Sequence, residues 1–126
     1  MDFPKNYKYT KDHEWIEVHG AKGTVGVTAY AIEQLGDIVH IDLPESGKSF
    51  KAGDSFGTIE STKTVSDLYM PVNGKVVEVN GNLKASPESL QSDAYKDGWL
   101  VRIEMSNPAE AAALLDAAAY DAFIKE

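Results

Sequence analysis

The chain has 126 residues, of which 43% are hydrophobic, and this length favours a single domain with a core that needs no covalent cross-links. Its 12 basic and 20 acidic residues give a formal net charge of −8, which repels nucleic acid and suits cationic ligands or basic partner surfaces. The absence of cysteine excludes disulfides, cysteine-ligated zinc and a thiol nucleophile.

The first nine residues do not have the pattern of a signal or transit peptide. No apolar run reaches the roughly 18 residues that a membrane span needs. We therefore expect a cytoplasmic protein.

The N-terminal third reads as a hairpin followed by a helix and a strand. Residues 13–19 and 23–27 are β segments separated by a short glycine-bounded turn. Thr28 predicts the N-cap of a short helix that ends before Gly36. Residues 38–43 then predict a strand.

Alternation in that strand places Val39, Ile41 and Leu43 on one face. Further β segments are expected at residues 54–60, 65–70, 75–79 and 98–105.

Two helical segments are expected in the C-terminal third. Ser86 as N-cap with proline at the next position predicts a short helix over residues 87–91. Asn107 caps an alanine-rich helical stretch over residues 109–123, and Asp116 is a second capping residue that can divide it.

The five-residue pattern P-x-x-G-K occurs twice, at residues 44–48 and 71–75, each time before a β segment. A repeat of this kind suits a small β-sandwich with approximate two-fold symmetry.

No catalytic or metal-binding pattern is visible in the sequence. The three histidines, His13, His19 and His40, fall on predicted strands without the tight spacing of a ligand set. Ser61 and Ser66 lack the glycine-flanked turn of a serine nucleophile. We expect neither an enzyme nor a metal site.

Lys63 lies between two β-prone stretches with no Gly, Pro or Asn at the junction, which places it at the tip of a hairpin. On composition alone it is an ordinary surface lysine. The alternative is an acceptor for a covalently attached prosthetic group, which would bring redox sulfur to a chain without cysteine.

Around this lysine the sequence resembles the lipoyl-attachment pattern, in which glycines lie sixteen residues before and eleven residues after the modified lysine. The matching positions are Gly47, Phe50, Phe56, Ile59, Lys63, Leu68, Gly74 and Val76.

Over nearly its whole length the chain resembles the H-protein family of the glycine cleavage system. The matching segments are Tyr9-Thr10, His13-Glu14-Trp15, Gly36-Asp37-Ile38, Glu60-Ser61, Ser66-Asp67-Leu68-Tyr69, Pro71-Val72, Gly74, Val76-Val77-Glu78-Val79-Asn80, Pro87-Glu88 and Gly98-Trp99-Leu100. The chain departs from the family at Thr62 and Thr64, where Val or Met before the lysine and Ala after it are more usual.

The resemblance implies a mainly β fold with short helices: a lipoyl/biotinyl-type flattened β-barrel, or hybrid-motif sandwich, with an N-terminal hairpin and C-terminal α-helices. The expected single lipoyl-carrier domain covers residues 1–126, with its core at about 23–105 and a helical extension at about 108–125.

The resemblance also implies a function as a monomeric carrier. Lipoate in amide linkage to Lys63 would take the aminomethyl group from glycine decarboxylase (P protein) to the tetrahydrofolate-dependent aminomethyltransferase (T protein). Dihydrolipoamide dehydrogenase (L protein) would reoxidise it. The expected location is the cytoplasm, or the mitochondrial matrix for a mature eukaryotic chain.

Four acidic residues receive roles by resemblance. Glu14 and Asp67, and less directly Asp12, are candidates for holding the cationic loaded arm in a cleft, or else they are solvated acids. Glu60 is assigned to recognition by the lipoyl-transferring enzyme.

Three other carriers remain as alternatives. A biotinyl carrier usually has Met on both sides of its lysine, and a 2-oxoacid dehydrogenase lipoyl domain continues into an Ala/Pro-rich linker. An H-like lipoyl carrier for lipoate relay or another lipoate-dependent pathway is the alternative that the sequence excludes least well.

Overall fold

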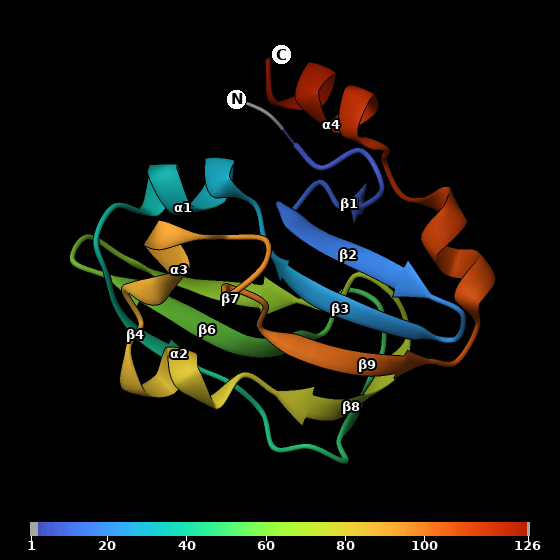
Figure 1. Ribbon diagram of the computed structural model, residues 1–126, viewed down its shortest axis with the longest axis horizontal. Helices are drawn as coiled ribbons and strands as arrows, with labels where there is room; N and C mark the ends of the chain where they lie inside the picture. The colour runs from blue at the N-terminus through green and yellow to red at the C-terminus, as the bar shows by residue number, and fades with distance from the viewer. Residues whose placement is uncertain (1–2, 126) are drawn as a thin grey trace.

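The computed structural model describes residues 3–125, so residues 1–2 and 126 of the expected domain lie outside the described residues. Two antiparallel sheets face each other (Figure 1). One is six-stranded in the order β1-β2-β3-β9-β8-β5, and the other is three-stranded in the order β4-β6-β7.

The strands alternate with short helices along the chain. The strands are β1 Lys8–Tyr9, β2 Glu14–His19, β3 Lys22–Val27, β4 Ile38–Asp42, β5 Ser49–Phe50, β6 Ser55–Ser61, β7 Val65–Tyr69, β8 Gly74–Val79 and β9 Val101–Met105. The helices are α1 Ala29–Leu35, α2 Gly81–Ala85, α3 Ser89–Ser92, the 3-10 helix η1 Pro108–Ala113 and α4 Ala117–Ile124.

Two apolar clusters hold these elements together. The larger cluster lies between the sheets and contains alternate residues of their strands, among them Val25, Ile59 and Ile103. The smaller cluster is aromatic, and in it Trp15 of the N-terminal hairpin packs with residues that include Tyr120 of α4. The C-terminal helix α4 therefore packs next to β1 at the edge of the larger sheet, as Figure 1 shows.

Several local predictions are confirmed. Strands β2 and β3 form the expected hairpin. The Thr28 hydroxyl accepts a hydrogen bond from the Ala31 N–H at the start of α1, and Gly36 ends that helix. Asp116 divides the alanine-rich tail, because its carboxylate accepts from the Ala119 N–H and caps α4.

The prediction that Val39 shares a face with Ile41 is wrong. Val39 is 49% exposed, whereas Ile41 is buried. A β-bulge between Ile38 and His40 breaks the alternation of β4 against β6, and such a bulge turns one residue to the opposite face.

The helices near the C-terminus also differ in detail from the predictions. Ser86 ends α2, which the sequence did not reveal, and its N–H donates to the Asn82 carbonyl. The next helix, α3, consequently begins later than expected. The first half of the alanine-rich tail is a 3-10 helix that ends at Ala113, and the Asp116 cap begins a separate α-helix.

The two P-x-x-G-K segments lie side by side. Strand β5, which follows the first segment, pairs with β8 through the register Ser49↔Lys75 and Phe50↔Gly74. The Gly47 N–H donates to the Val76 carbonyl, and the Val76 N–H donates to the Lys48 carbonyl. The repeat thus closes one edge of the larger sheet.

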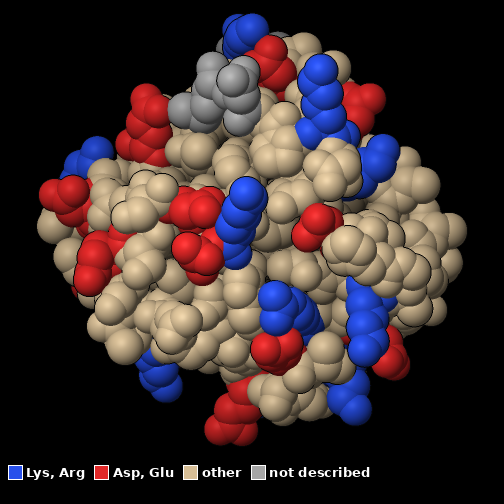
Figure 2. Space-filling model, viewed as in Figure 1, with Lys and Arg blue, Asp and Glu red and all other residues tan. Residues whose placement is uncertain are grey.

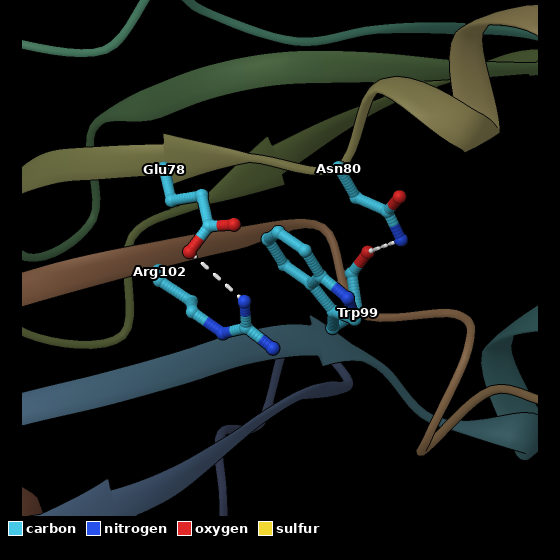
Figure 3. A network of polar contacts seen from close by, with 4 residues as sticks. All are labelled: Glu78, Asn80, Trp99 and Arg102. Atoms are coloured by element: carbon cyan, nitrogen blue, oxygen red, sulfur yellow. Dashed lines mark hydrogen bonds and ion pairs between the residues drawn. The ribbon is translucent and has the colours of Figure 1, made fainter.

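The outer face of the larger sheet carries a polar network (Figure 3). The Arg102 guanidinium lies 2.9 Å from the Glu78 carboxylate and 4.0 Å from the Trp99 ring centroid. The buried Asn80 amide donates to the carbonyls of Trp99 and Asp97, which ties the loop before β9 to the end of β8. Both signs of charge lie on this face, so it is not uniformly acidic (Figure 2).

Within the described residues, no helix combines the length and apolar character that a bilayer crossing requires.

We predict that Gly26→Ala destabilises the fold. A β-carbon at Gly26 would collide with the indole ring of Trp15, its partner across the β2–β3 hairpin. That ring is fully buried and its N–H donates to the Val27 and Ala94 carbonyls, so it cannot move aside freely. Urea denaturation should show a loss of about 1–3 kcal/mol in the free energy of unfolding.

The matched control is Gly81→Ala, because a β-carbon there would meet nothing within 4 Å. Its free energy of unfolding should stay equal or rise by up to about 1 kcal/mol. Equal stability of the two variants would contradict the predicted role of the indole contact.

Candidate functional site

Lys63 lies at the exposed tip of the β6–β7 hairpin, in a turn that a serine side chain builds. Ser61 is 5% exposed, and its hydroxyl oxygen accepts hydrogen bonds from the N–H groups of Lys63 at 3.2 Å and Thr64 at 3.1 Å. The Ser61 N–H donates to the Thr64 carbonyl at 2.8 Å. A side-chain oxygen thus satisfies the turn in place of the usual glycine or proline chemistry.

In the sequence, Ser61 stands out only as a serine without the context of a nucleophile, so its structural role in the turn was not predicted. The residues between the two β-prone stretches did contain an indication of this role. A tight turn without Gly, Pro or Asn needs another source of hydrogen bonds, and Ser61 is the nearest hydroxyl on its N-terminal side.

The loop between α1 and β4 supports the tip from outside the hairpin. Thr62 donates its N–H to the Asp37 carbonyl at 3.0 Å. Gly36 has a φ of +85°, and a β-carbon there would lie 3.1 Å from the Lys63 Cε. The positive φ favours glycine at this position, and its missing side chain leaves room for the flexible end of the lysine.

Gln91 of α3 holds this loop in turn. Its side-chain oxygen accepts from the Ile38 N–H at 3.2 Å, and its side-chain nitrogen donates to the Gly36 carbonyl at 3.3 Å. One amide therefore binds the peptide groups on both sides of Asp37, the residue that bonds to the lysine turn. No sequence pattern indicates Gln91, because its side chain bonds to residues that are 53 and 55 positions away in the chain.

A cavity of about 370 Å³ lies beside the hairpin, between α1 and strand β7. Its lining combines carboxyl groups with apolar side chains and includes Ser66, three residues after Lys63. The lining residues are Asp12, His13, Glu14, Val27, Tyr30, Ala31, Gln34, Leu35, Ile59, Ser66, Asp67 and Leu68. The structure thus brings together all three acids that the sequence analysis named for the arm cleft.

Glu14 is the buried acid of this cavity, with only 2% of its surface exposed. Its carboxyl group accepts hydrogen bonds from the Thr10 hydroxyl at 2.9 Å and from the Tyr69 N–H at 3.4 Å. Burial raises its pKa from 4.5 to about 8, although both hydrogen bonds oppose the shift. Glu14 is therefore mostly protonated at neutral pH, and a cation in the cavity would favour its ionised form.

The other two acids are exposed to solvent. Asp67 accepts a hydrogen bond from the Ser55 hydroxyl at 3.0 Å. Asp12 lies in the loop before β2, where its N–H donates to the Thr10 hydroxyl oxygen. The cavity consequently has one buried carboxyl group and two that stay hydrated.

His13 lines the cavity but does not lie on a strand, so the prediction that it shares a strand face with His19 is wrong. The parity of residues 13 and 19 had predicted one shared strand face for the two histidines, but strand β2 begins at Glu14, and His13 before it has a φ of +71°. Its Nδ1 lies 2.7 Å from the Tyr120 hydroxyl, which lies 2.8 Å from the Thr28 hydroxyl. Burial lowers the pKa of His13. Helix α4 is thereby connected to the cavity wall.

Glu60 lies apart from the cavity. It is exposed on β6, directly opposite His40 on β4 and Val65 on β7. Within residues 3–125, no three His, Asp or Glu side chains lie close enough together to hold a metal ion.

We predict that Glu14 makes stability depend on pH. Because its pKa is higher in the folded protein, the folded state binds more protons than the unfolded chain between about pH 4.5 and pH 8. The free energy of unfolding should therefore fall, relative to Glu14→Gln, by on the order of a few kcal/mol as the pH rises through that window. Urea denaturation at several pH values measures this difference.

Glu104→Gln serves as the control, because Glu104 is an exposed acid on the larger sheet. Its stability should follow that of the unmodified sequence across the same pH range. If the free energy of unfolding of Glu14→Gln also varied with pH in parallel with that of the unmodified sequence, the prediction that folding raises the pKa of Glu14 would be wrong.

Comparisons with known sequences point to one protein family. A sequence model described as glycine cleavage H-protein matches residues 7–126. A glycine cleavage system H protein from Symbiobacterium thermophilum is 57% identical over 98% of this chain and 96% of its own length. One from Brevibacillus brevis is 48% identical over the full length of both chains.

The crystal structure of a glycine cleavage system H protein from Mycobacterium marinum superposes with a TM-score of 0.90 at 40% identity. It covers 98% of this chain and 100% of that one. This likeness confirms the expected flattened, barrel-like fold. The chain therefore belongs to the glycine cleavage H-protein family, the carrier component of that system rather than one of its enzymes.

Proposed function

We propose that this chain is the lipoyl carrier of the glycine cleavage system, with lipoate attached in amide linkage to Lys63. The observation that carries the proposal is the placement of an exposed lysine on a rigid turn next to a cavity of mixed apolar and acidic character. Attachment requires only that the neutral Nζ attack the carbonyl carbon of an activated lipoyl group, whose leaving group departs as Nζ loses a proton.

The residues present fit such a group. Val27, Leu35 and Leu68 offer apolar walls to a hydrocarbon arm, and the acids offer partners to an amine. When bound, lipoate would supply the disulfide chemistry for carrying the aminomethyl group of glycine, and the residues that line the cavity would hold the arm. Tethering keeps its local concentration high at each partner.

The chain's own residues would protect the cationic cargo. In this proposal Glu14 and Asp67, with Asp12 nearby, hold the amine, while the apolar walls exclude water. Ionisation of Glu14 on binding a cation would offset the unfavourable burial of both charges, because the pair is then neutral.

The proposed partners are glycine decarboxylase, the aminomethyltransferase and dihydrolipoamide dehydrogenase. In this proposal the lipoyl-transferring enzyme recognises Glu60, which lies three residues before the lysine. We propose that the protein acts as a monomer in the cytoplasm, or in the mitochondrial matrix if the chain is a mature eukaryotic one.

The cofactor proposal predicts a lipoyl mass increment. Intact mass spectrometry after expression with lipoate should show one increment that Lys63→Arg abolishes. Lys75→Arg is the matched control, because Lys75 is also an exposed lysine but lies on strand β8 instead of at the hairpin tip, and the increment should persist there. An increment that survives in Lys63→Arg would reject the assignment of the site.

The same lipoylated protein should support exchange of the glycine carboxyl group with bicarbonate by glycine decarboxylase. Lys63→Arg should abolish this exchange. A lipoylated protein that supports no exchange would favour lipoate relay or another lipoate-dependent pathway instead.

The arm-holding role predicts a shorter lifetime of the aminomethyl-loaded protein in Glu14→Ala and Asp67→Ala. Loss of a charge-assisted contact should raise the rate of hydrolytic ammonia release by about tenfold. Glu104→Ala, outside the cavity, should leave the rate unchanged. Unchanged rates in both cavity variants would mean that these residues are ordinary solvated acids.

A further inference from the structure

A chain of hydrogen bonds connects the start of α1 with His13 on the cavity wall, and its middle member comes from α4. The Tyr120 hydroxyl lies 2.7 Å from the His13 Nδ1 and 2.8 Å from the Thr28 hydroxyl oxygen. Tyr120 and Thr28 are both fully buried, so solvent does not complete their hydrogen bonds. Leaving a buried hydroxyl proton without an acceptor is costly, and this cost decides which group donates at each step.

The direction of the chain follows from Thr28. Within residues 3–125, the other partner of its hydroxyl group is the Ala31 N–H, which only donates. The Thr28 proton therefore goes to the Tyr120 oxygen, and the Tyr120 proton goes to the His13 Nδ1. A neutral imidazole that accepts at Nδ1 carries its own proton at Nε2. Burial lowers the pKa of His13, so the neutral ring is the form present at neutral pH.

In this tautomer the His13 ring has no lone pair free. Its Nδ1 accepts from Tyr120, and its Nε2 bears a proton and accepts nothing. An imidazole with a free lone pair is the side chain best suited to take up a proton near neutral pH. His13 lines the cavity together with Glu14, Asp67 and Asp12. The hydrogen-bonded chain thus keeps a base out of the cavity in which the function proposed above places a cationic amine.

The backbone of His13 is held independently of Tyr120. The Thr28 N–H donates to the His13 carbonyl at 3.0 Å, and the His13 N–H donates to the Thr10 carbonyl at 3.2 Å. These bonds keep the residue at its positive φ and join the loop before β2 to α1. The Tyr120 hydroxyl adds the tautomer and the orientation of the ring. Removal of that hydroxyl alone should therefore change the ring and leave the cavity wall in place.

We propose that Tyr120 is a positioning residue of the arm cavity, which prevents the His13 imidazole from taking a proton from the cationic cargo; this rests on the function proposed above. The amine is attracted to the cavity acids only while it is protonated, so a base beside it would release the cargo to water. Helix α4 would thus lengthen the lifetime of the loaded protein through one hydroxyl group, 107 residues away from His13 in the chain.

The tautomer is tested first, on the bare protein with no cofactor attached. The ¹⁵N chemical shifts of an imidazole distinguish a protonated ring nitrogen from one that only accepts. In the unmodified sequence, His13 should be protonated at Nε2 and not at Nδ1. Tyr120→Phe should give a mixture of the two tautomers. A His13 ring protonated at Nδ1 in the unmodified sequence would overturn the inference.

The consequence for the cargo is tested with two variants and their combination. Protein with lipoate at Lys63 is loaded by glycine decarboxylase and glycine, separated from the enzyme and followed by ammonia release. Tyr120→Phe should release ammonia at least about tenfold faster, because a well-positioned general base contributes about a hundredfold or more. His13→Asn keeps an acceptor near the position of Nδ1, tolerates the positive φ and supplies no base. In the double variant the rate should return to that of His13→Asn alone.

Tyr9→Phe is the matched control. Tyr9 is fully buried in the same aromatic cluster, and its ring stacks on that of Tyr120 with the centroids 5.0 Å apart. Its hydroxyl donates to the Pro4 carbonyl at 2.6 Å and not to a residue of the cavity. Urea denaturation should show a comparable loss of stability in Tyr9→Phe and Tyr120→Phe. Only Tyr120→Phe should change the His13 tautomer and the rate of ammonia release.

The remaining outcomes contradict the inference. Equal ammonia release from Tyr120→Phe and the unmodified sequence would show that a freed His13 ring takes no proton from the cargo. Fast release that persists in the double variant, or that also appears in Tyr9→Phe, would indicate loosened packing instead of a freed lone pair. These results leave the proposed function standing, whereas failure of the unmodified sequence to carry lipoate at Lys63 would reject both.

Discussion

The turn that carries Lys63 is the constraint on which the rest of the site depends. A group attached to this lysine can be presented reproducibly only if the backbone beneath it is held. Ser61 satisfies two N–H groups of the turn from inside the hairpin, and the Asp37 carbonyl holds a third from the neighbouring loop. The Lys63 side chain remains exposed. The backbone of the turn is therefore held in place while the amine stays accessible.

The support of that turn extends into the helical layer. Gln91 fixes the peptides on both sides of Asp37, and Gly36 leaves room for the lysine stem. Helix α1, which ends at Gly36, also contributes Ala31 and Leu35 to the cavity. The position of the lysine and the shape of the cavity are therefore set by the same short helix and the loop after it.

The buried carboxyl group of the cavity, Glu14, is neutral in the empty protein at neutral pH. A permanently ionised carboxylate at the position of Glu14 would be costly because the residue is buried. Its raised pKa keeps it neutral until a cation or higher pH favours ionisation. A buried neutral acid next to hydrated ones can accept a cationic cargo without destabilising the empty protein as strongly as a fixed charge would.

The sequence by itself determined the order of most strands, the capping of α1 and α4, and the position of Lys63 at a hairpin tip, because alternation, caps and turns are local patterns. Resemblance added Glu14, Asp67 and Asp12 as candidates. Only the tertiary structure decided that Val39 faces outward, that Ser61 builds the turn and that Tyr120 meets His13. These features depend on a bulge, on burial and on contacts such as Glu14–Tyr69 and His13–Tyr120, which join residues 55 and 107 positions apart. No local pattern encodes such contacts, because they arise from the packing of the whole sandwich.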